Sequence, residues 1–217
     1  MTIDENREEA SNTGRGMNIS SLRKDDLDVL SIADATNHPD SSALDFCSGD
    51  GAMALEFSRL IKKVTAWDVL RPSLVEKDPL GYEKVSIIQK DIRDKSVLPE
   101  GRPFDIVVWQ RAIHYLTWSE AIDVLLRLKE WLSPGGRLYV SASGFDSELG
   151  ADYPGKNARV EERFDFLSPE MQEKHDIRKR VCLYRISELV SVLKKCGYTV
   201  DDSWYSPFGN VKVVSHV

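Results

Sequence analysis

The stretch "ALDFCSGDGAMALEF", residues 43–57, joins an apolar run, two glycines and the start of a helical pattern. We expect a strand over 42–47 and a helix over 51–61, with a tight turn between them. Gly49 and Gly51 let the backbone of such a turn approach a ligand, and the free N–H groups of the following helix favour a negatively charged group. The pair also fits the loose dinucleotide pattern G-x-G-x-x-A, which by itself can be a simple turn. The ligand therefore has to be identified from other residues.

Strands and helices alternate beyond this stretch. Strands are predicted over 63–68, 84–91, 104–110 and 137–143, and an amphipathic helix over 119–132 precedes the helix-stopping "SPGG". This alternation indicates an α/β fold with a parallel sheet and right-handed crossovers. A last helix ending at Gly197 is followed by strands over 199–205 and 210–217 around the turn "SPFG". We expect these two strands to form a terminal hairpin that runs antiparallel to its neighbours.

The length of 217 residues fits one domain with one core. We expect a flexible polar tail over 1–19 and a single domain over 20–217, which begins with a helix over about 20–36. Between about 145 and 180 the chain is charged and irregular, and too long for a simple connection. We interpret this segment as a lid-like insertion.

Composition argues against several classes of function. The net charge is −6, which disfavours a surface built to bind nucleic acid. No run of 18 apolar residues predicts a membrane span, and the polar N-terminal segment is unlike a secretory signal. Three cysteines, Cys47, Cys182 and Cys196, form no CxxC pair and no cluster with metal-ligand spacing. We therefore expect a cytoplasmic protein without a metal site.

Three aspartates lie in or at the end of successive predicted strands. Asp45, just before the glycine turn, would repel a pyrophosphate but would suit an ammonium group. Asp68 ends the second strand, where a carboxylate can accept hydrogen bonds from ribose hydroxyls. Asp91 ends the third strand and can accept from an adenine amine, with Ile92 against the ring. An amino acid, a ribose and an adenine in this order describe S-adenosylmethionine (SAM).

With these residues the sequence resembles the class I SAM-dependent methyltransferases. The segments "ALDFCSGDG", "VTAWD", "QKDIRD" and "FDIVVWQRAIHYL" look like the first four motifs of that family, and "LKEWLSPGGRLYVSAS" looks like the helix and strand that follow. Cys47 departs from the pattern, because the first glycine of the motif is usual at its position. The resemblance implies a doubly wound, mostly parallel sheet of seven strands whose last strand is antiparallel.

The resemblance also implies a set of cofactor-binding residues, with SAM as the cofactor and S-adenosylhomocysteine (SAH) as its product. The methionine part would lie among the residues of the glycine turn, the ribose beside the end of the second strand, and the adenine beside the end of the third. Gln110, at the end of the fourth strand, would lie near the sulfonium. The predicted set is Asp45, Cys47, Ser48, Gly49, Gly51, Asp68, Val69, Leu70, Asp91, Ile92 and Gln110.

Candidate catalytic residues cluster in "WQRAIHYLTW", residues 109–118. His114 titrates near neutrality in water and is the candidate general base, although it can equally pack against the adenine or cap a helix. Tyr115 is a candidate for positioning the acceptor, or a core residue. Arg111 is a candidate clamp for an acidic acceptor, or a partner of a surface acid.

The acceptor is narrowed by motifs that the sequence lacks. No Asn/Asp-Pro-Pro-aromatic motif, no Pro-Cys nucleophile and no acidic magnesium cluster follows the fourth strand. A small-molecule acceptor is therefore the leading hypothesis, and a loose similarity to bacterial tellurite-resistance-type and metabolite methyltransferases agrees with it. The alternatives are a protein or peptide methyltransferase, a SAM-binding module without turnover, and an NAD-dependent oxidoreductase, which Asp45 and Asp91 disfavour. A monomer or a homodimer is expected.

Overall fold

The structure is a computed structural model that describes residues 26–217. The tail expected over 1–19, and the first residues of the helix expected over 20–36, lie outside the described residues. The described part of that helix is α2, Asp26–Asn37, which ends just before His38 and Pro39.

The centre of the fold is a seven-stranded sheet with strand order β3-β2-β1-β4-β5-β7-β6. All neighbouring strands pair in parallel except that β7 runs antiparallel to both β5 and β6. This order confirms the predicted doubly wound sheet and the antiparallel last strand. The strands are β1 Ser42–Phe46, β2 Lys63–Asp68, β3 Val85–Gln89, β4 Phe104–Trp109, β5 Leu132–Ala142, β6 Thr199–Tyr205 and β7 Val211–His216.

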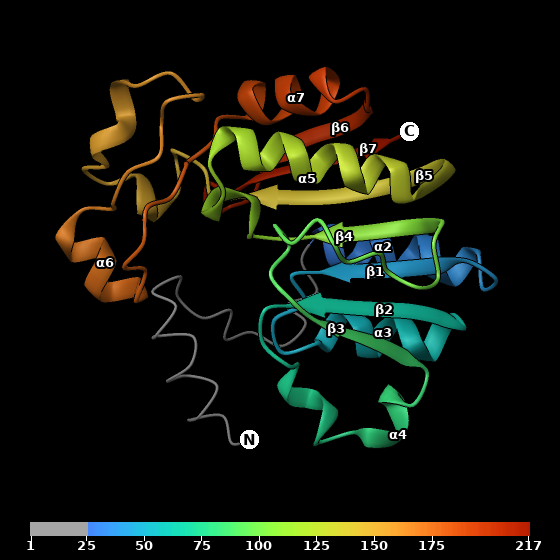
Figure 1. Ribbon diagram of the computed structural model, residues 1–217. Coiled ribbons are helices and arrows are strands. Elements are labelled where there is room, and N and C mark those ends of the chain that lie inside the picture. Colours follow the sequence, from blue (N-terminus) through green and yellow to red (C-terminus); the bar gives the residue numbers. More distant parts are fainter. Residues whose placement is uncertain (1–25) are drawn as a thin grey trace.

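Helices cover both faces of this sheet (Figure 1). On one face the side chains of α5, Trp118–Trp131, and α7, Ile186–Lys195, share one core cluster with Leu44 and Phe46 of β1. On the other face α2 and α3, Ala52–Leu60, pack against Ala43. Successive residues of β1 thus point to opposite faces, and both faces are buried, as expected for a parallel sheet. The remaining helices are α4 Pro79–Tyr82 and α6 Pro169–His175, with short 3₁₀ turns η1 Ser73–Val75, η2 Ile113–Tyr115, η3 Glu148–Gly150 and η4 Pro154–Asn157.

The strand after α5 begins earlier than the sequence predicts. Leu132 already pairs with Phe104, whereas the regular ladder with β4 resumes only at Arg137, across a register shift. The segment 133–136 lies in this shift, so its proline and glycines interrupt the ladder without ending the strand. The expected end of the helix near "SPGG" is confirmed, but the expected strand over 137–143 is five residues too short at its start.

The segment 145–180, expected to be irregular, has a small core of its own. Apolar side chains from η3, η4, α6 and the chain after α6 pack together, with Tyr115 and Phe145 against them. The segment follows β5 and lies at the end of the sheet toward which the parallel strands point (Figure 1). This core consists of Leu149, Tyr153, Leu167, Met171, Ile177, Val181 and Leu183.

Candidate active site

The glycine turn between β1 and α3 takes a backbone conformation that few residues adopt. Cys47, Gly49 and Gly51 have φ of 62°, 56° and 88°, and the backbone N–H groups of Cys47 and Ser48 both donate to the carbonyl of Trp67, at 2.7 and 3.1 Å. The turn is therefore fixed against the end of β2. It lies where strand order reverses between β1 and β4, the place where open α/β sheets bind ligands.

Gly51 has no room for a side chain. A Cβ atom there would lie 1.9 Å from the Tyr82 hydroxyl and 2.7 Å from Cβ of Pro72. The Tyr82 hydroxyl donates a hydrogen bond of 2.5 Å to the carbonyl of Gly51. The second glycine of the motif is therefore required by the packing of α4 and the loop before it, as well as by its positive φ.

Asp45 and Asp68 reach the turn from two neighbouring strands. Asp45 is 5% exposed, and its Oδ2 accepts from the backbone N of Ala54, at 3.0 Å. Burial, together with the nearby carboxylates of Asp68, Asp50 and Asp28, raises the pKa of the Asp45 carboxyl to about 8, although the hydrogen bond from Ala54 lowers it in part. Asp68 accepts from the backbone N of Gly49 at 2.9 Å, and burial raises its pKa as well. A pocket edge with this many buried acids is suited to a cationic ligand.

The end of β2 continues with two residues of the predicted set. The second oxygen of Asp68 accepts from the backbone N of Leu70, at 3.1 Å. Val69 is 42% exposed, so its side chain lies at the surface of the site. Both observations are compatible with a ribose beside Asp68, and this position of the ribose stays a prediction.

Asp91 follows β3 and is held by an arginine that sequence reasoning missed. Arg93 Nε donates to Asp91 Oδ1 at 3.0 Å, and Nη2 donates to Oδ2 at 2.6 Å. The same guanidinium also contacts Glu120, at 3.3 Å, which belongs to the capping box of α5. Asp91 Oδ1 also accepts from the backbone N of Arg93, at 2.9 Å. Ile92 beside it is buried in the core on the α5 face.

Gln110, directly after β4, contacts a second residue that was missed. Its Nε2 donates to Oδ1 of Asp28, at 2.5 Å. Asp28 comes from α2 and is 5% exposed. Helix α2 thus places a buried acid beside Gln110, and this acid carries no recognisable sequence motif.

Ser48 supplies an observation that points to a polar ligand. Its Oγ is buried and has no hydrogen-bond partner among residues 26–217. Buried hydroxyls are normally satisfied, so one in the middle of the glycine turn fits a site that receives a polar group. With the acids of β1, β2 and the turn after β3, the chain offers an acceptor set that fits the ammonium, ribose and adenine groups of SAM.

His114 lies on η2 at the same end of the sheet and is 2% exposed. Its imidazole lies against Ser143. The backbone N of Ser143 lies 3.4 Å from Nδ1 of the ring, and the Ser143 Oγ lies 3.4 Å from Nε2. Burial, and then the charge of Arg111, lowers the pKa of His114 to about 3. The ring is therefore neutral near pH 7. The backbone carbonyl of His114 accepts from the backbone N of Cys182, at 2.8 Å. This hydrogen bond connects η2 to the chain that follows the insertion.

Arg111 and Tyr115 flank this histidine. Arg111 has a positive φ of 50°, and its N–H lies 3.0 Å from both the carbonyl and the hydroxyl oxygen of Ser141. Its positive charge acts on the ionisation of both His114 and Asp50. The ring centroid of Tyr115 lies 4.2 Å from that of His114. The structure thus brings the three candidate catalytic residues together beside the predicted cofactor residues.

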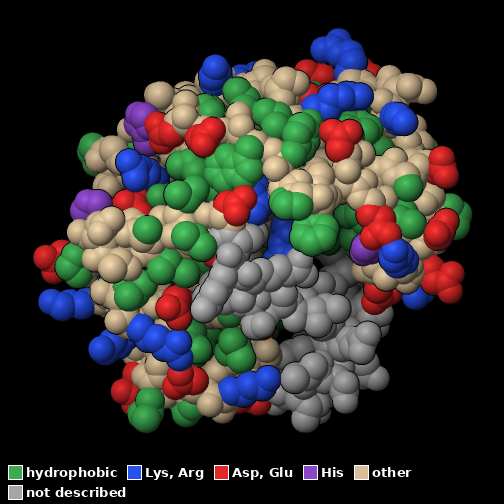
Figure 2. Space-filling model, turned by 180° about the vertical axis from the view of Figure 1, so that it is seen from behind, with side chains coloured by type: hydrophobic (Ala, Val, Ile, Leu, Met, Phe, Trp, Pro, Cys, Tyr) green, Lys and Arg blue, Asp and Glu red, His purple; other side chains and the backbone are tan. Residues whose placement is uncertain are grey.

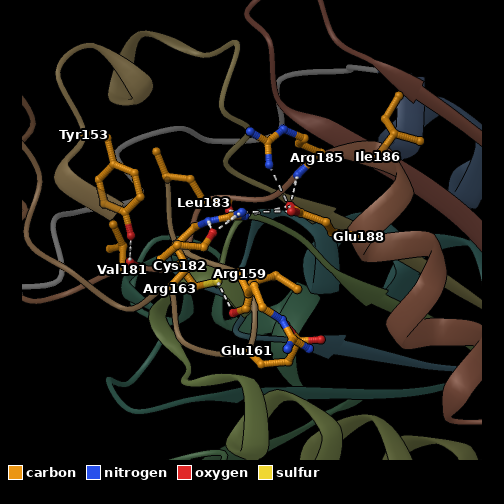
Figure 3. Close-up of polar contacts among 12 residues, drawn as sticks. Tyr153, Arg159, Glu161, Arg163, Val181, Cys182, Leu183, Arg185, Ile186 and Glu188 are labelled. Atoms are coloured by element: carbon orange, nitrogen blue, oxygen red, sulfur yellow. Dashed lines mark hydrogen bonds and ion pairs between the residues drawn. The ribbon is translucent and has the colours of Figure 1, made fainter. Parts of the chain in front are cut away.

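A buried ion pair fastens the insertion beside this group. Arg163 is 2% exposed and donates to both oxygens of Glu188 on α7, at 2.7 and 2.9 Å (Figure 3). It also donates to the carbonyl of Leu183, at 2.9 Å. The two neighbours of Leu183 also form backbone hydrogen bonds. Cys182 N–H donates to the carbonyl of His114, and Tyr184 N–H donates to the carbonyl of Ser143. The ion pair therefore sets the position of the strand-like segment behind His114.

Cys47 yields a stability prediction, because it takes a left-handed conformation that favours glycine. Cys47→Gly and Cys47→Ala both lose the thiol, so their difference isolates the backbone. We expect Cys47→Gly to be the more stable by about 1 kcal/mol in urea unfolding, since the left-handed conformation costs other residues about 1–2 kcal/mol. At Cys196, where φ is −80°, the order should reverse. A Cys47→Ala variant more stable than Cys47→Gly would contradict the assigned conformation.

Comparison with known proteins places this geometry among methyltransferases. Residues 43–136 match the family model described as a methyltransferase domain. A search of curated proteins found no match. A structure of 1,6-didemethyltoxoflavin-N1-methyltransferase from Burkholderia thailandensis, solved with 1,6-didemethyltoxoflavin and SAH, has 18% identity and a TM-score of 0.64 over 89% of this chain and 79% of that chain.

Two further structures agree. N-methyltransferase NodS from Bradyrhizobium japonicum, in complex with SAH, has 12% identity and a TM-score of 0.60, and the match covers 97% of both chains. An O-methyltransferase family protein from Burkholderia thailandensis has 16% identity and a TM-score of 0.63 over 88% of this chain, which spans about half, 54%, of its length. Residues 43–136 thus match a methyltransferase domain model, and the chain has the class I methyltransferase fold.

Proposed function

We propose that this chain is a SAM-dependent methyltransferase that transfers the methyl group of SAM to a small-molecule acceptor. The observation that carries the proposal is the convergence of Asp45, Asp68 and the unpaired Ser48 hydroxyl on one glycine turn of a methyltransferase fold. The full set proposed to bind the cofactor is the one predicted from the sequence, with Asp45 and the turn at the methionine part, Asp68 at the ribose, and Asp91 with Ile92 at the adenine.

SAM, when bound, supplies a methyl group on a sulfonium leaving group, so the chemistry is an in-line displacement that yields SAH. The chain then mainly has to align the acceptor and exclude water. His114, neutral and held against Ser143, is suited to orienting an acceptor by a hydrogen bond. A pKa of about 3 makes it a weak base, because an efficient general base has a pKa near the working pH. Tyr115 and Arg111 remain its proposed companions on the acceptor side.

The acceptor is proposed to enter between η2 and the segment 145–180. Arg111 there favours an acceptor with an anionic group, since its guanidinium forms paired hydrogen bonds with carboxylates and phosphates. The similar structure of 1,6-didemethyltoxoflavin-N1-methyltransferase was solved with 1,6-didemethyltoxoflavin bound. The finer similarity to tellurite-resistance-type enzymes remains a proposal, as does the role of the insertion as a lid.

Macromolecular acceptors and a module without turnover remain the alternatives. Figure 2 shows acidic and basic side chains interspersed over the described part of the visible face, which is not the footprint of a nucleic-acid binder. Within residues 26–217 no helix is long and apolar enough to span a bilayer. A cytoplasmic location, a monomer or homodimer, and the absence of nucleic-acid partners remain predictions.

Binding of SAM should become tighter as the pH rises from 6 to 8. Below a pKa of about 8 the free Asp45 carboxyl holds a proton, and a cationic ligand must expel this proton to gain the carboxylate. Affinity then falls by up to about tenfold for each pH unit below that pKa. Calorimetry in two buffers with different ionisation enthalpies should count close to one proton released per SAM bound near pH 6.5.

Asp45→Asn is the matched control for this dependence. The variant has no proton to lose at this position, so its SAM affinity should be nearly constant over the same pH range. An affinity of the unaltered protein that is flat or falls as the pH rises would contradict the placement of Asp45 beside the cationic end of the ligand.

The acceptor class is tested by transfer of a labelled methyl group. The protein is incubated with methyl-labelled SAM and a cell extract separated into small molecules and macromolecules. Label in the small-molecule fraction supports the proposal, whereas label in the protein fraction supports the peptide alternative. SAM binding without label in either fraction would favour a module without turnover. Asp68→Asn is the control, because it should lower transfer to every fraction.

A further inference from the structure

We infer that Asp28 of α2 makes the site prefer the charged donor SAM over its uncharged product SAH. The inference rests on the proposed function and adds to it a residue outside the recognised motifs. SAM carries a positive sulfonium and SAH a neutral thioether, so a buried negative charge close to the sulfur distinguishes them.

Helix α2 is anchored by residues other than Asp28. Two other acids of α2 hydrogen-bond to strands: Asp26 accepts from Trp204 Nε1 at 3.0 Å, and Asp34 accepts from the Tyr139 hydroxyl at 2.9 Å. Leu27 and Ala35 of the same helix are fully buried in the core. The helix is therefore fixed on both sides of Asp28, and removal of the Asp28 charge should leave it in position.

Asp28 also fixes the side chain of Gln110. A carboxylate can only accept, so the amide group facing Asp28 Oδ1 at 2.5 Å must be the NH₂ group of Gln110. The carbonyl oxygen of Gln110 consequently points away from Asp28. The pair thus presents an acceptor oxygen and a buried negative charge at the end of β4, where the resemblance places the sulfonium.

The charge of Asp28 is felt at the glycine turn. Its carboxylate disfavours ionisation of Asp45, as do those of Asp68 and Asp50. Asp28 is thus close enough to act electrostatically on a ligand at the turn, and its burial limits screening by water and salt.

The test compares the affinities of SAM and SAH for the same variants. Asp28→Asn keeps an oxygen that can accept from Gln110 Nε2 and removes the negative charge. We expect it to weaken SAM binding about tenfold and to change SAH binding by less than about threefold, as measured by calorimetry on ligand-free protein. Asp34→Asn, on the same helix but bonded to Tyr139, should leave the ratio of the two affinities unchanged.

The outcomes separate this inference from the proposed function. If Asp28→Asn weakens the binding of SAM and of SAH equally, or changes the binding of neither, Asp28 has only a structural role and the inference is wrong. If the unaltered protein binds neither ligand, the proposed function fails as well. Gln110→Met keeps the charge of Asp28 and should retain the preference for SAM even if both affinities fall. Loss of the preference in that variant would overturn the inference without relying on the folding of Asp28→Asn.

Discussion

Replacement of Arg163 by methionine should lower the free energy of unfolding by about 3–5 kcal/mol, because it leaves the half-buried carboxylate of Glu188 without its main partner. Arg163 is 2% exposed and donates to both oxygens of Glu188, and to the carbonyl oxygens of Leu183 and Ala158. Its guanidinium also lies 4.4 Å from the ring centroid of Phe145. Methionine fills a similar volume but supplies none of these hydrogen bonds.

Arg185→Met is the matched control for this prediction. Arg185 lies 4.3 Å from the centroid of the same Phe145 ring and contacts the same Glu188 at 3.1 Å, but its side chain is 45% exposed. Exposed ion pairs contribute about 0–1 kcal/mol, so this variant should lose little. Equal midpoint shifts in urea denaturation for the two variants would contradict the assignment of Arg163 as the residue that fastens the insertion to α7.

Replacement of Gly51 by alanine should destabilise the protein by about 2–5 kcal/mol, as the sum of backbone strain and overpacking. The backbone has φ of 88°, and the added Cβ would meet the Tyr82 hydroxyl and Pro72. Either the glycine turn or α4 has to move, and the hydrogen bond from Tyr82 to the Gly51 carbonyl is lost. We also expect SAH binding to weaken about tenfold or more, a change of about 1.4 kcal/mol.

Gly135→Ala separates the clash from the strain. Gly135 has a similar φ of 77°, but no atom lies within 4 Å of a Cβ placed there. This variant should therefore show only the cost of the backbone, about 1–2 kcal/mol, and unchanged SAH binding. Thermal unfolding and SAH titration of both variants give the comparison. A Gly51→Ala variant no less stable than Gly135→Ala would show that the turn is less tightly packed than described.

The sheet could be predicted from the sequence because its signals are local. Apolar runs followed by Gly49 and Gly51, by Asp68 or by Asp91 mark strand ends at one edge, and the observed order of strands follows from right-handed crossovers. The predicted start of β5 was wrong, because the pairing of Leu132 with Phe104 depends on a neighbouring strand and not on the local sequence. Pro134 and the glycines after it indicate a stop by every local rule.

Three residues of the candidate site were missing from the sequence interpretation for the same reason. Asp28, Tyr82 and Arg93 contact Gln110, Gly51 and Asp91, respectively, and two of these contacts cross long separations in the chain. A buried acid on an amphipathic helix looks like any solvent-facing acid until the partner is known. His114 was recognised as a candidate, but its burial, which makes it neutral, depends on residues distant in the sequence such as Ser143.

The central claim, that the glycine turn and its acids bind SAM, is tested most directly by calorimetric titration of the ligand-free, folded protein with SAH, with NAD as the control. The account predicts one site per chain with micromolar affinity for SAH and no binding of NAD. Binding of NAD instead of SAH, or of neither, would contradict it, because Asp45, Asp68 and Asp91 would then not form the site assigned to them.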